Sequence, residues 1–259
     1  LAASFGQLAT LVLVFTLLVF KSSLFLILAA LLAGNTLMVF LSIFLVRKEV
    51  TSIWPAFDWQ FIKKITMTTL PLGATLVFNL IYFRADSFLL SILKPTQEVG
   101  VYGLAFKFFE LPLAIPTFFG NAIYPVLLAN KNGKNFRKII FLSSIILFLT
   151  SLGLLLILWL GAPLIAFIQK DFTLSISPFR ILILSLPLFF LTSLYQWGLV
   201  VLNRQKLLAF IYFFSMILNI VLNILFIPKY SYLAASVITG ISEGIVFLLT
   251  LIFIVKSLK

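Results

Sequence analysis

Eight long apolar stretches dominate this sequence and restrict the folds that it can adopt. Each is long enough for a helix to cross about 30 Å of hydrocarbon, which takes about 20 residues and at least about 17. Lipid offers no partners for backbone N–H and C=O groups, and the ten-residue alternation typical of barrel strands does not occur here. The sequence therefore predicts an all-α polytopic transmembrane helix bundle of about eight spans. These spans fall near 4–20, 23–46, 65–93, 100–128, 139–160, 178–201, 207–227 and 232–256.

Composition excludes several classes of soluble protein. Hydrophobic residues make up 63% of the chain and charged residues only 10%, against about half and a quarter in an ordinary soluble domain. The formal charge of +12 would suit nucleic acid, but the basic residues lie in short gaps between apolar runs, so no nucleic-acid partner is predicted. Cys and His are both absent, which removes disulfides, thiolate and imidazole ligands and a Ser/His/Asp triad. No metal or other cofactor is expected.

The basic residues alternate between the two sides of the predicted bundle. Cytoplasmic connections collect Lys and Arg, so the richer set predicts the cytoplasmic side and places the C-terminus there. We expect a multi-pass protein of the plasma (inner) membrane. The richer set consists of Arg47, Lys48, Lys63, Lys64, Lys131, Lys134, Arg137, Lys138, Arg204, Lys206, Lys256 and Lys259.

A polar connection at 47–64 divides the chain into two unequal parts. It mixes aromatic, proline and charged residues, a composition that suits a strip at the headgroup level. We interpret it as a cytoplasmic interfacial linker between residues 1–46, the last two helices of a first lobe, and residues 65–259, a six-helix second lobe. Two spans before the linker and six after it predict an N-terminally truncated chain.

Apart from Lys256 at the very end of the last span, six charged residues lie inside the predicted spans. Each costs about 2.5–3.5 kcal/mol at mid-helix on insertion scales, so it should face protein or a wet cavity. Counted along their helices, Arg84 and Lys107 reach similar depth, and Lys107 shares a helix face with Glu110. A four-residue network with Asp86 across the third and fourth spans is expected. The six residues are Arg84, Lys107, Arg180, Asp86, Glu110 and Glu243.

Two interpretations of this cluster stay open. The residues could be internal salt bridges that fix helix register. Alternatively they line a hydrated cavity, where Arg84 and Lys107 bind an anionic head group and Asp86 or Glu110 balances charge or carries H⁺ or Na⁺.

Arg180 and Glu243 each allow two interpretations as well. Arg180, near a helix end, either snorkels to the headgroups or lines the cavity and binds substrate. Glu243 lies beside a small-residue stripe formed by Ser236, Gly240 and Gly244, so it either hydrogen-bonds a neighbour within a close helix packing or couples an ion. Pro112 and Pro116 predict a bend just inward of Glu110.

The chain from about residue 60 to its end resembles a known transporter family. The resemblance rests on Leu202-Asn203-Arg204-Gln205-Lys206, Asn219 with Asn223, Ile227-Pro228-Lys229-Tyr230, Ala234-Ala235, Ser242-Glu243, Val99-Gly100-Val101-Tyr102-Gly103-Leu104-Ala105-Phe106-Lys107 and Arg84 with Asp86. These segments resemble the Wzx-type polysaccharide flippases of the multidrug/oligosaccharidyl-lipid/polysaccharide exporter superfamily. The match is imperfect after the Ile-Pro turn, where Ser231 and Leu233 stand in place of glycines.

The resemblance implies two six-helix lobes that rock around a central cavity and flip an undecaprenyl-pyrophosphate-linked oligosaccharide for surface polysaccharide synthesis. Lipid-linked oligosaccharide and membrane lipids would be the partners. An alternative is a cation-coupled exporter of drugs or organic cations from the same superfamily. A membrane glycosyltransferase or polymerase is a further alternative, but it needs paired carboxylates or a large outward loop. Because neither is present, we expect no enzyme; a purely structural scaffold would not need polar groups at mid-depth.

Overall fold

The computed structural model of the chain is helical throughout the part that it describes. This part comprises residues 2–20, 23–47, 57–131, 135–168 and 170–257, and it contains no strand. The chain separates into two compact units, one of residues 1–62 and one of residues 63–259. The all-α fold class predicted from the apolar stretches is confirmed.

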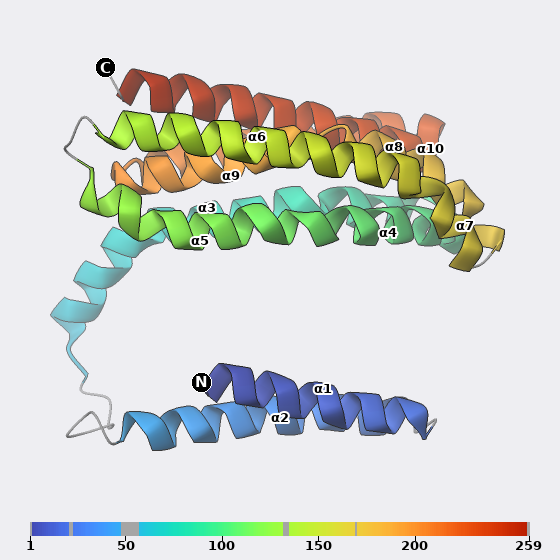
Figure 1. The fold of residues 1–259 in the computed structure, drawn as a ribbon, viewed down its shortest axis with the longest axis horizontal. Coiled ribbons are helices and arrows are strands. Elements are labelled where there is room, and N and C mark those ends of the chain that lie inside the picture. Colours follow the sequence, from blue (N-terminus) through green and yellow to red (C-terminus); the bar gives the residue numbers. More distant parts are fainter. Residues whose placement is uncertain (1, 21–22, 48–56, 132–134, 169, 258–259) are drawn as a thin grey trace. The chain divides into compact units, whose positions relative to one another are not determined.

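Two closely packed helices form the first unit. α1 (Ala2–Val19) and α2 (Leu24–Val46) lie along each other (Figure 1). The contact depends on small residues, because a Cβ added to Gly34 would lie 1.8 Å from Oγ1 of Thr10 and one added to Gly6 would lie 2.6 Å from Cβ of Met38. Close approach of this kind stabilises a helix pair in lipid through van der Waals contacts, because lipid provides no hydrophobic driving force between helices.

α3 (Trp59–Leu93) begins inside the segment that the sequence assigned to the linker. Backbone N–H groups of Gln60 and Phe61 donate to Oδ1 of Asp58 at 2.9 and 3.0 Å, so Asp58 caps the helix. Residues 59–64 are therefore helical, so α3 begins before the predicted span at 65–93. The rest of the linker's polar strip, at 48–56, lies outside the described residues.

Two of the next membrane-length segments are interrupted rather than straight. α4 (Thr96–Glu110) passes through the short 3₁₀ helix η1 (Leu111–Leu113) into α5 (Ala114–Ala129). Pro112 lies in η1, as expected from its missing N–H group. Later, α8 (Ile176–Ile183) and α9 (Leu186–Val201) meet at a break before Pro187, where the chain bends by 46°.

α6 (Asn135–Gly161) crosses the second unit in one piece. The short helices η2 (Ala162–Leu164), α7 (Ile165–Ile168) and η3 (Lys170–Ser175) join it to α8. α9 lies at the centre of the packing, because it contacts α5, α6 and α10.

α10 (Gln205–Ser257) is a helical hairpin with two arms. Its 53 residues would span about 80 Å as a straight helix, but Ser231 has φ 52° and ψ −136°, which breaks the helix there. The amide of Asn219 donates to Oγ of Ser242 at 3.2 Å, so the chain folds back at Ser231 and the arms lie side by side.

Length and hydropathy qualify five described helices as candidate membrane spans, or six if the bent α8–α9 pair counts as one. α10 is a single helix in that count, although it supplies two arms. The apolar segment Gly6–Val19 in α1 is shorter than the usual minimum. Each of the eight predicted spans thus coincides with a helix, a pair of consecutive helices or an arm of α10.

Candidate functional site

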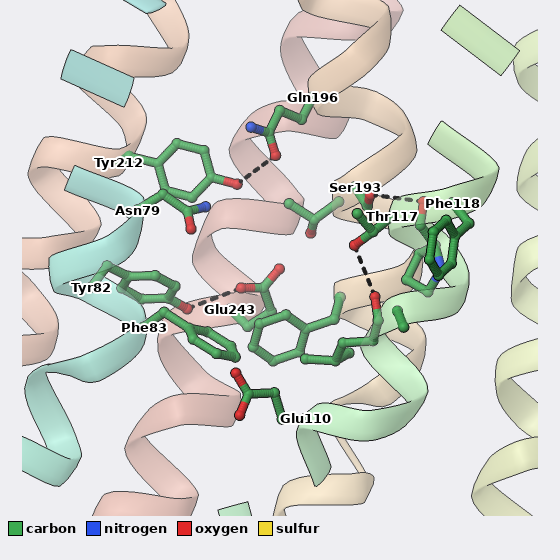
Figure 2. A pocket seen from close by; sticks show the side chains of 15 residues that line it. Asn79, Tyr82, Phe83, Glu110, Thr117, Phe118, Ser193, Gln196, Tyr212 and Glu243 are labelled. Carbon is green, nitrogen blue, oxygen red and sulfur yellow. Dashed lines mark hydrogen bonds between the residues drawn. The ribbon is translucent and has the colours of Figure 1, made fainter. Parts of the chain in front are cut away.

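A polar cavity of about 480 Å³ lies within the second unit (Figure 2). Four parts of the chain form its walls: α3, the α4–η1–α5 segment, α9 and both arms of α10. Its lining residues are Asn79, Tyr82, Phe83, Glu110, Leu113, Ala114, Pro116, Thr117, Phe118, Phe189, Thr192, Ser193, Gln196, Tyr212 and Glu243.

Neutral hydrogen-bonding groups occupy one end of the cavity. The hydroxyl of Tyr212 donates to Oε1 of Gln196 at 3.2 Å, and Asn79 lies beside Tyr212 (Figure 2). Oγ of Ser193 donates to the carbonyl oxygen of Pro116 at 3.4 Å. The hydroxyl of Thr192 is buried and faces the Glu243 carboxylate. This end therefore offers donors and acceptors to a polar molecule.

Glu243 extends from the second arm of α10 into the cavity. The hydroxyl of Tyr82 donates to its Oε2 atom at 3.0 Å, and both residues are buried. Gly240, in the stripe beside Glu243, faces Ser185, since an added Cβ would lie 3.7 Å from Cβ of Ser185, an ordinary van der Waals contact. A hydrogen bond to a neighbour through a close helix contact was one of the two sequence-based interpretations of Glu243, and the geometry fits it.

Glu110 lies at the opposite side of the cavity and links it to two basic residues. Its Oε1 atom lies 2.5 Å from Nη2 of Arg84, and its Oε2 atom lies 3.6 Å from Nζ of Lys107. The Arg84 and Lys107 side chains are 48% and 75% exposed, against 29% for Glu110. The cluster carries one net positive charge, and its basic members are accessible from outside the bundle.

Aromatic rings hold the Arg84 guanidinium in place. Its Cζ atom lies 5.5 Å from the centre of the Phe83 ring and 5.6 Å from that of Phe106. Phe83 lines the cavity and packs edge-on against Phe106 at 5.0 Å and against Phe189 at 6.0 Å. Cation–π contacts of this kind orient a cation without neutralising it.

The predicted network contains three of its four expected members. Arg84, Lys107 and Glu110 meet across α3 and α4, but only Glu110 lines the cavity, so the two basic residues lie at its edge. Asp86 faces another way. Its carboxylate accepts hydrogen bonds from the Tyr102 hydroxyl, from Oγ1 of Thr239 at 2.9 Å and from the backbone N–H of Ser87 at 2.6 Å.

Arg180 does not line this cavity. Its Cζ atom lies 5.1 Å from the centre of the Trp159 ring, and its Nε atom is buried with no hydrogen-bond partner in the structure. It therefore packs on α6 rather than beside Arg84.

Sequence reasoning missed the neutral polar residues of the site because it considered only charged ones. On α3 a detectable signal was present: Asn79, Tyr82 and Asp86 follow at intervals of three and four and so share one helix face. Gln196 and Tyr212 gave no such signal, since their meeting depends on how α9 packs against α10.

Comparison with family models gives two matches. The MatE model matches residues 71–225, which is more than half of the chain, and a model described as a polysaccharide biosynthesis protein matches residues 3–131. A comparison with curated proteins returns no match.

Two solved structures share the fold. One is the lipid II flippase MurJ in an inward closed conformation, with a TM-score of 0.73 and 20% identity over 98% of this chain. The other is an outward-facing multidrug resistance MATE family transporter of the MOP superfamily, with a TM-score of 0.75 and 15% identity over 99% of this chain. The chain spans 55% and 61% of the length of these two structures.

Proposed function

Because the chain belongs to the MatE family of the multidrug/oligosaccharidyl-lipid/polysaccharide exporter superfamily, we propose that it acts in flipping a lipid-linked oligosaccharide across the plasma membrane. The substrate would be an undecaprenyl-pyrophosphate-linked oligosaccharide for surface polysaccharide synthesis. Support for this substrate comes from the match to the polysaccharide biosynthesis model and from the cavity described above.

The observation that carries the proposal is the neutral polar end of the cavity. Sugar hydroxyl groups both donate and accept hydrogen bonds, as the side chains of Asn79, Thr192, Ser193, Gln196 and Tyr212 do. An unpaired hydroxyl costs roughly 2–7 kcal/mol on transfer to an apolar medium. A wall of hydroxyl and amide groups would lower that cost while an isoprenoid tail stays in lipid.

The second element of the proposal is the basic pair at the cavity edge. Arg84 and Lys107 outnumber Glu110 in their cluster and are partly exposed, so a pyrophosphate could approach them. The forked donors of an arginine match phosphate oxygens. We assign Arg84 and Lys107 to the head group and Glu110 to charge balance when the site is empty.

Binding to the purified protein in nanodiscs tests this assignment. We expect the double variant Arg84→Gln/Lys107→Gln to bind an undecaprenyl-pyrophosphate oligosaccharide at least about tenfold more weakly, since hydrogen bonds to charged groups contribute about 1.5–3 kcal/mol. Lys229→Gln removes an exposed cation that lies over Tyr230 instead and should leave binding unchanged. Equal affinity in the wild type and the double variant would refute the head-group role.

An organic-cation exporter is a second candidate, and one observation favours it. Two carboxylates, Glu110 and Glu243, line the cavity, whereas its described lining contains no Lys or Arg. Tetraphenylphosphonium is a suitable probe in the same nanodiscs. The exporter function is supported if tetraphenylphosphonium binds to the wild type and binds more weakly to Glu243→Gln. If the lipid-linked sugar also does not bind, the flippase proposal is refuted.

Coupling to H⁺ or Na⁺ is part of the proposal. Asp86, Glu110 and Glu243 are the carboxylates within the spans. Glu110 is already paired with Arg84, whereas Glu243 has a tyrosine hydroxyl as its partner, so we favour Glu243. After reconstitution, Glu243→Gln should abolish the dependence of transport on an ion gradient and Glu110→Gln should retain it. The reverse result would assign coupling to Glu110.

A further inference from the structure

A second cavity, separate from the polar one, opens between α6, α9 and the second arm of α10. Its volume is about 400 Å³, within the range of about 300–1,000 Å³ typical of ligand sites. It shares no lining residue with the first cavity. Most of its lining is apolar, and Arg137 is the one charged residue among the described residues that form it.

The length of this groove corresponds to one leaflet of a bilayer. Its lining residues on α6 run from Arg137 to Phe148, and eleven helical steps cover about 16 Å. Half of a hydrocarbon core of about 30 Å is nearly the same distance. Arg137 lies near the start of α6, so the charge is at the headgroup end and the apolar walls extend toward the bilayer centre.

The walls of the groove are built by close helix packing. Gly198 on α9 leaves room for two isoleucines, because a Cβ there would lie 3.0 Å from Cδ1 of Ile254 and 3.2 Å from Cδ1 of Ile140. Both isoleucines line the groove and are buried. Phe141 and Phe148 stand exposed at its rim. An apolar chain could therefore lie between a fixed floor and two aromatic side chains.

The charge around the open end favours an anionic partner. The described stretches 129–131, 135–138, 202–207 and 255–257 lie at this end of the second unit (Figure 1), and none of them contains Asp or Glu. Together they carry six Lys and Arg residues. Arg137 alone among these projects into the lining of the groove. Basic pockets between transmembrane helices of this kind bind anionic lipid head groups.

We propose that this groove is a binding site for an anionic phospholipid of the surrounding membrane. One acyl chain lies along α6 between the isoleucine floor and the phenylalanine rim, and the phosphate accepts hydrogen bonds from the Arg137 guanidinium. A zwitterionic phospholipid fits the apolar part equally well, but the uniformly basic end attracts its head group less strongly.

Native mass spectrometry of the protein from nanodiscs with equal amounts of phosphatidylglycerol and phosphatidylcholine tests the site. The wild type should retain phosphatidylglycerol preferentially, and Arg137→Gln should reduce that preference several-fold. Lys138→Gln removes the neighbouring charge, which does not line the groove, and should keep the preference. An equal reduction in both variants would mean diffuse attraction to the basic end and would overturn the proposal, as would no reduction in Arg137→Gln.

The apolar part of the site has its own test. Ser144 lines the groove midway along α6, and Ser144→Leu places a larger side chain there while the Arg137 charge stays. Retention of phosphatidylglycerol should fall in this variant although the thermal stability of the protein is kept. Unchanged retention in a stable Ser144→Leu protein would show that no acyl chain occupies the groove.

Discussion

Asp86 illustrates how a single carboxyl group is accommodated among apolar helices. It is 2% exposed and accepts hydrogen bonds from Tyr102, Thr239 and the backbone of Ser87. All of these donors come from α3, α4 and α10, so the residue joins three helices. An unpaired buried polar group is costly, and each donor therefore contributes to the stability of the second unit.

Removing one donor at this carboxyl gives the first prediction. We expect Tyr102→Phe to lower the free energy of unfolding in detergent by about 1–2 kcal/mol, between the average for hydrogen bonds in membrane proteins and the value for charged partners. Tyr230→Phe changes an exposed tyrosine in the same way and should have no effect. Similar losses in both variants would show that the Tyr102 hydroxyl contributes nothing specific.

At this scale the sequence identified charged residues better than it identified their partners. Arg84, Lys107 and Glu110 could be grouped because helix depth and the three-residue spacing are properties of one or two neighbouring helices. The spacing of two between Arg84 and Asp86 points their side chains in different directions, although the sequence was interpreted as one network with both. The pairing of Asp86 with Thr239 could not be predicted, because that contact joins residues 153 positions apart.

At the scale of elements, the backbone conformation of Ser231 in the turn of α10 can be tested by mutation. Ser231 adopts φ 52°, a conformation that costs a non-glycine residue about 1–3 kcal/mol, while its hydroxyl donates to the Glu98 carboxylate. Ser231→Gly and Ser231→Ala both lose that hydrogen bond, but only Gly relieves the backbone. We expect Ser231→Gly to be more stable than Ser231→Ala by about 1–2 kcal/mol in thermal unfolding.

A helical serine provides the control for this turn. Ser91 is exposed and lies in the last turn of α3, where Gly is less favourable than Ala by up to about 1 kcal/mol. The order of stability should therefore reverse between the two sites. The same order at both would mean that the positive φ of Ser231 stores no strain.

The elements themselves could be predicted from hydropathy with few corrections. Long apolar runs predicted the positions of the helices, and Pro112 indicated the break between α4 and α5. α3 begins at Trp59, before the predicted span at 65–93, because Asp58 caps it, and hydropathy does not register a capping signal. The neutral polar cavity was also missed, since its walls combine helices whose packing partners no single stretch of sequence specifies.

The orientation of the whole molecule remains a proposal that the absence of cysteine makes easy to test. We propose that the C-terminus and the other basic connections lie in the cytoplasm. Because the chain has no Cys, Gln97→Cys and Ser257→Cys each carry a single thiol at opposite ends of the second unit. In intact cells a membrane-impermeant maleimide should label Gln97→Cys, and label Ser257→Cys only after permeabilisation. The opposite pattern would invert the topology.

The hairpin of α10 has a consequence for biogenesis. Its second arm supplies Thr239 and Glu243, which face acceptors or donors on the earlier helices α3 and α4. Because this arm is synthesised after α3 and α4, it would meet Tyr82, Asp86 and Tyr102 already in the bilayer. Polar groups already present on α3 and α4 would favour lateral release of the hairpin from the translocon onto these helices rather than into lipid.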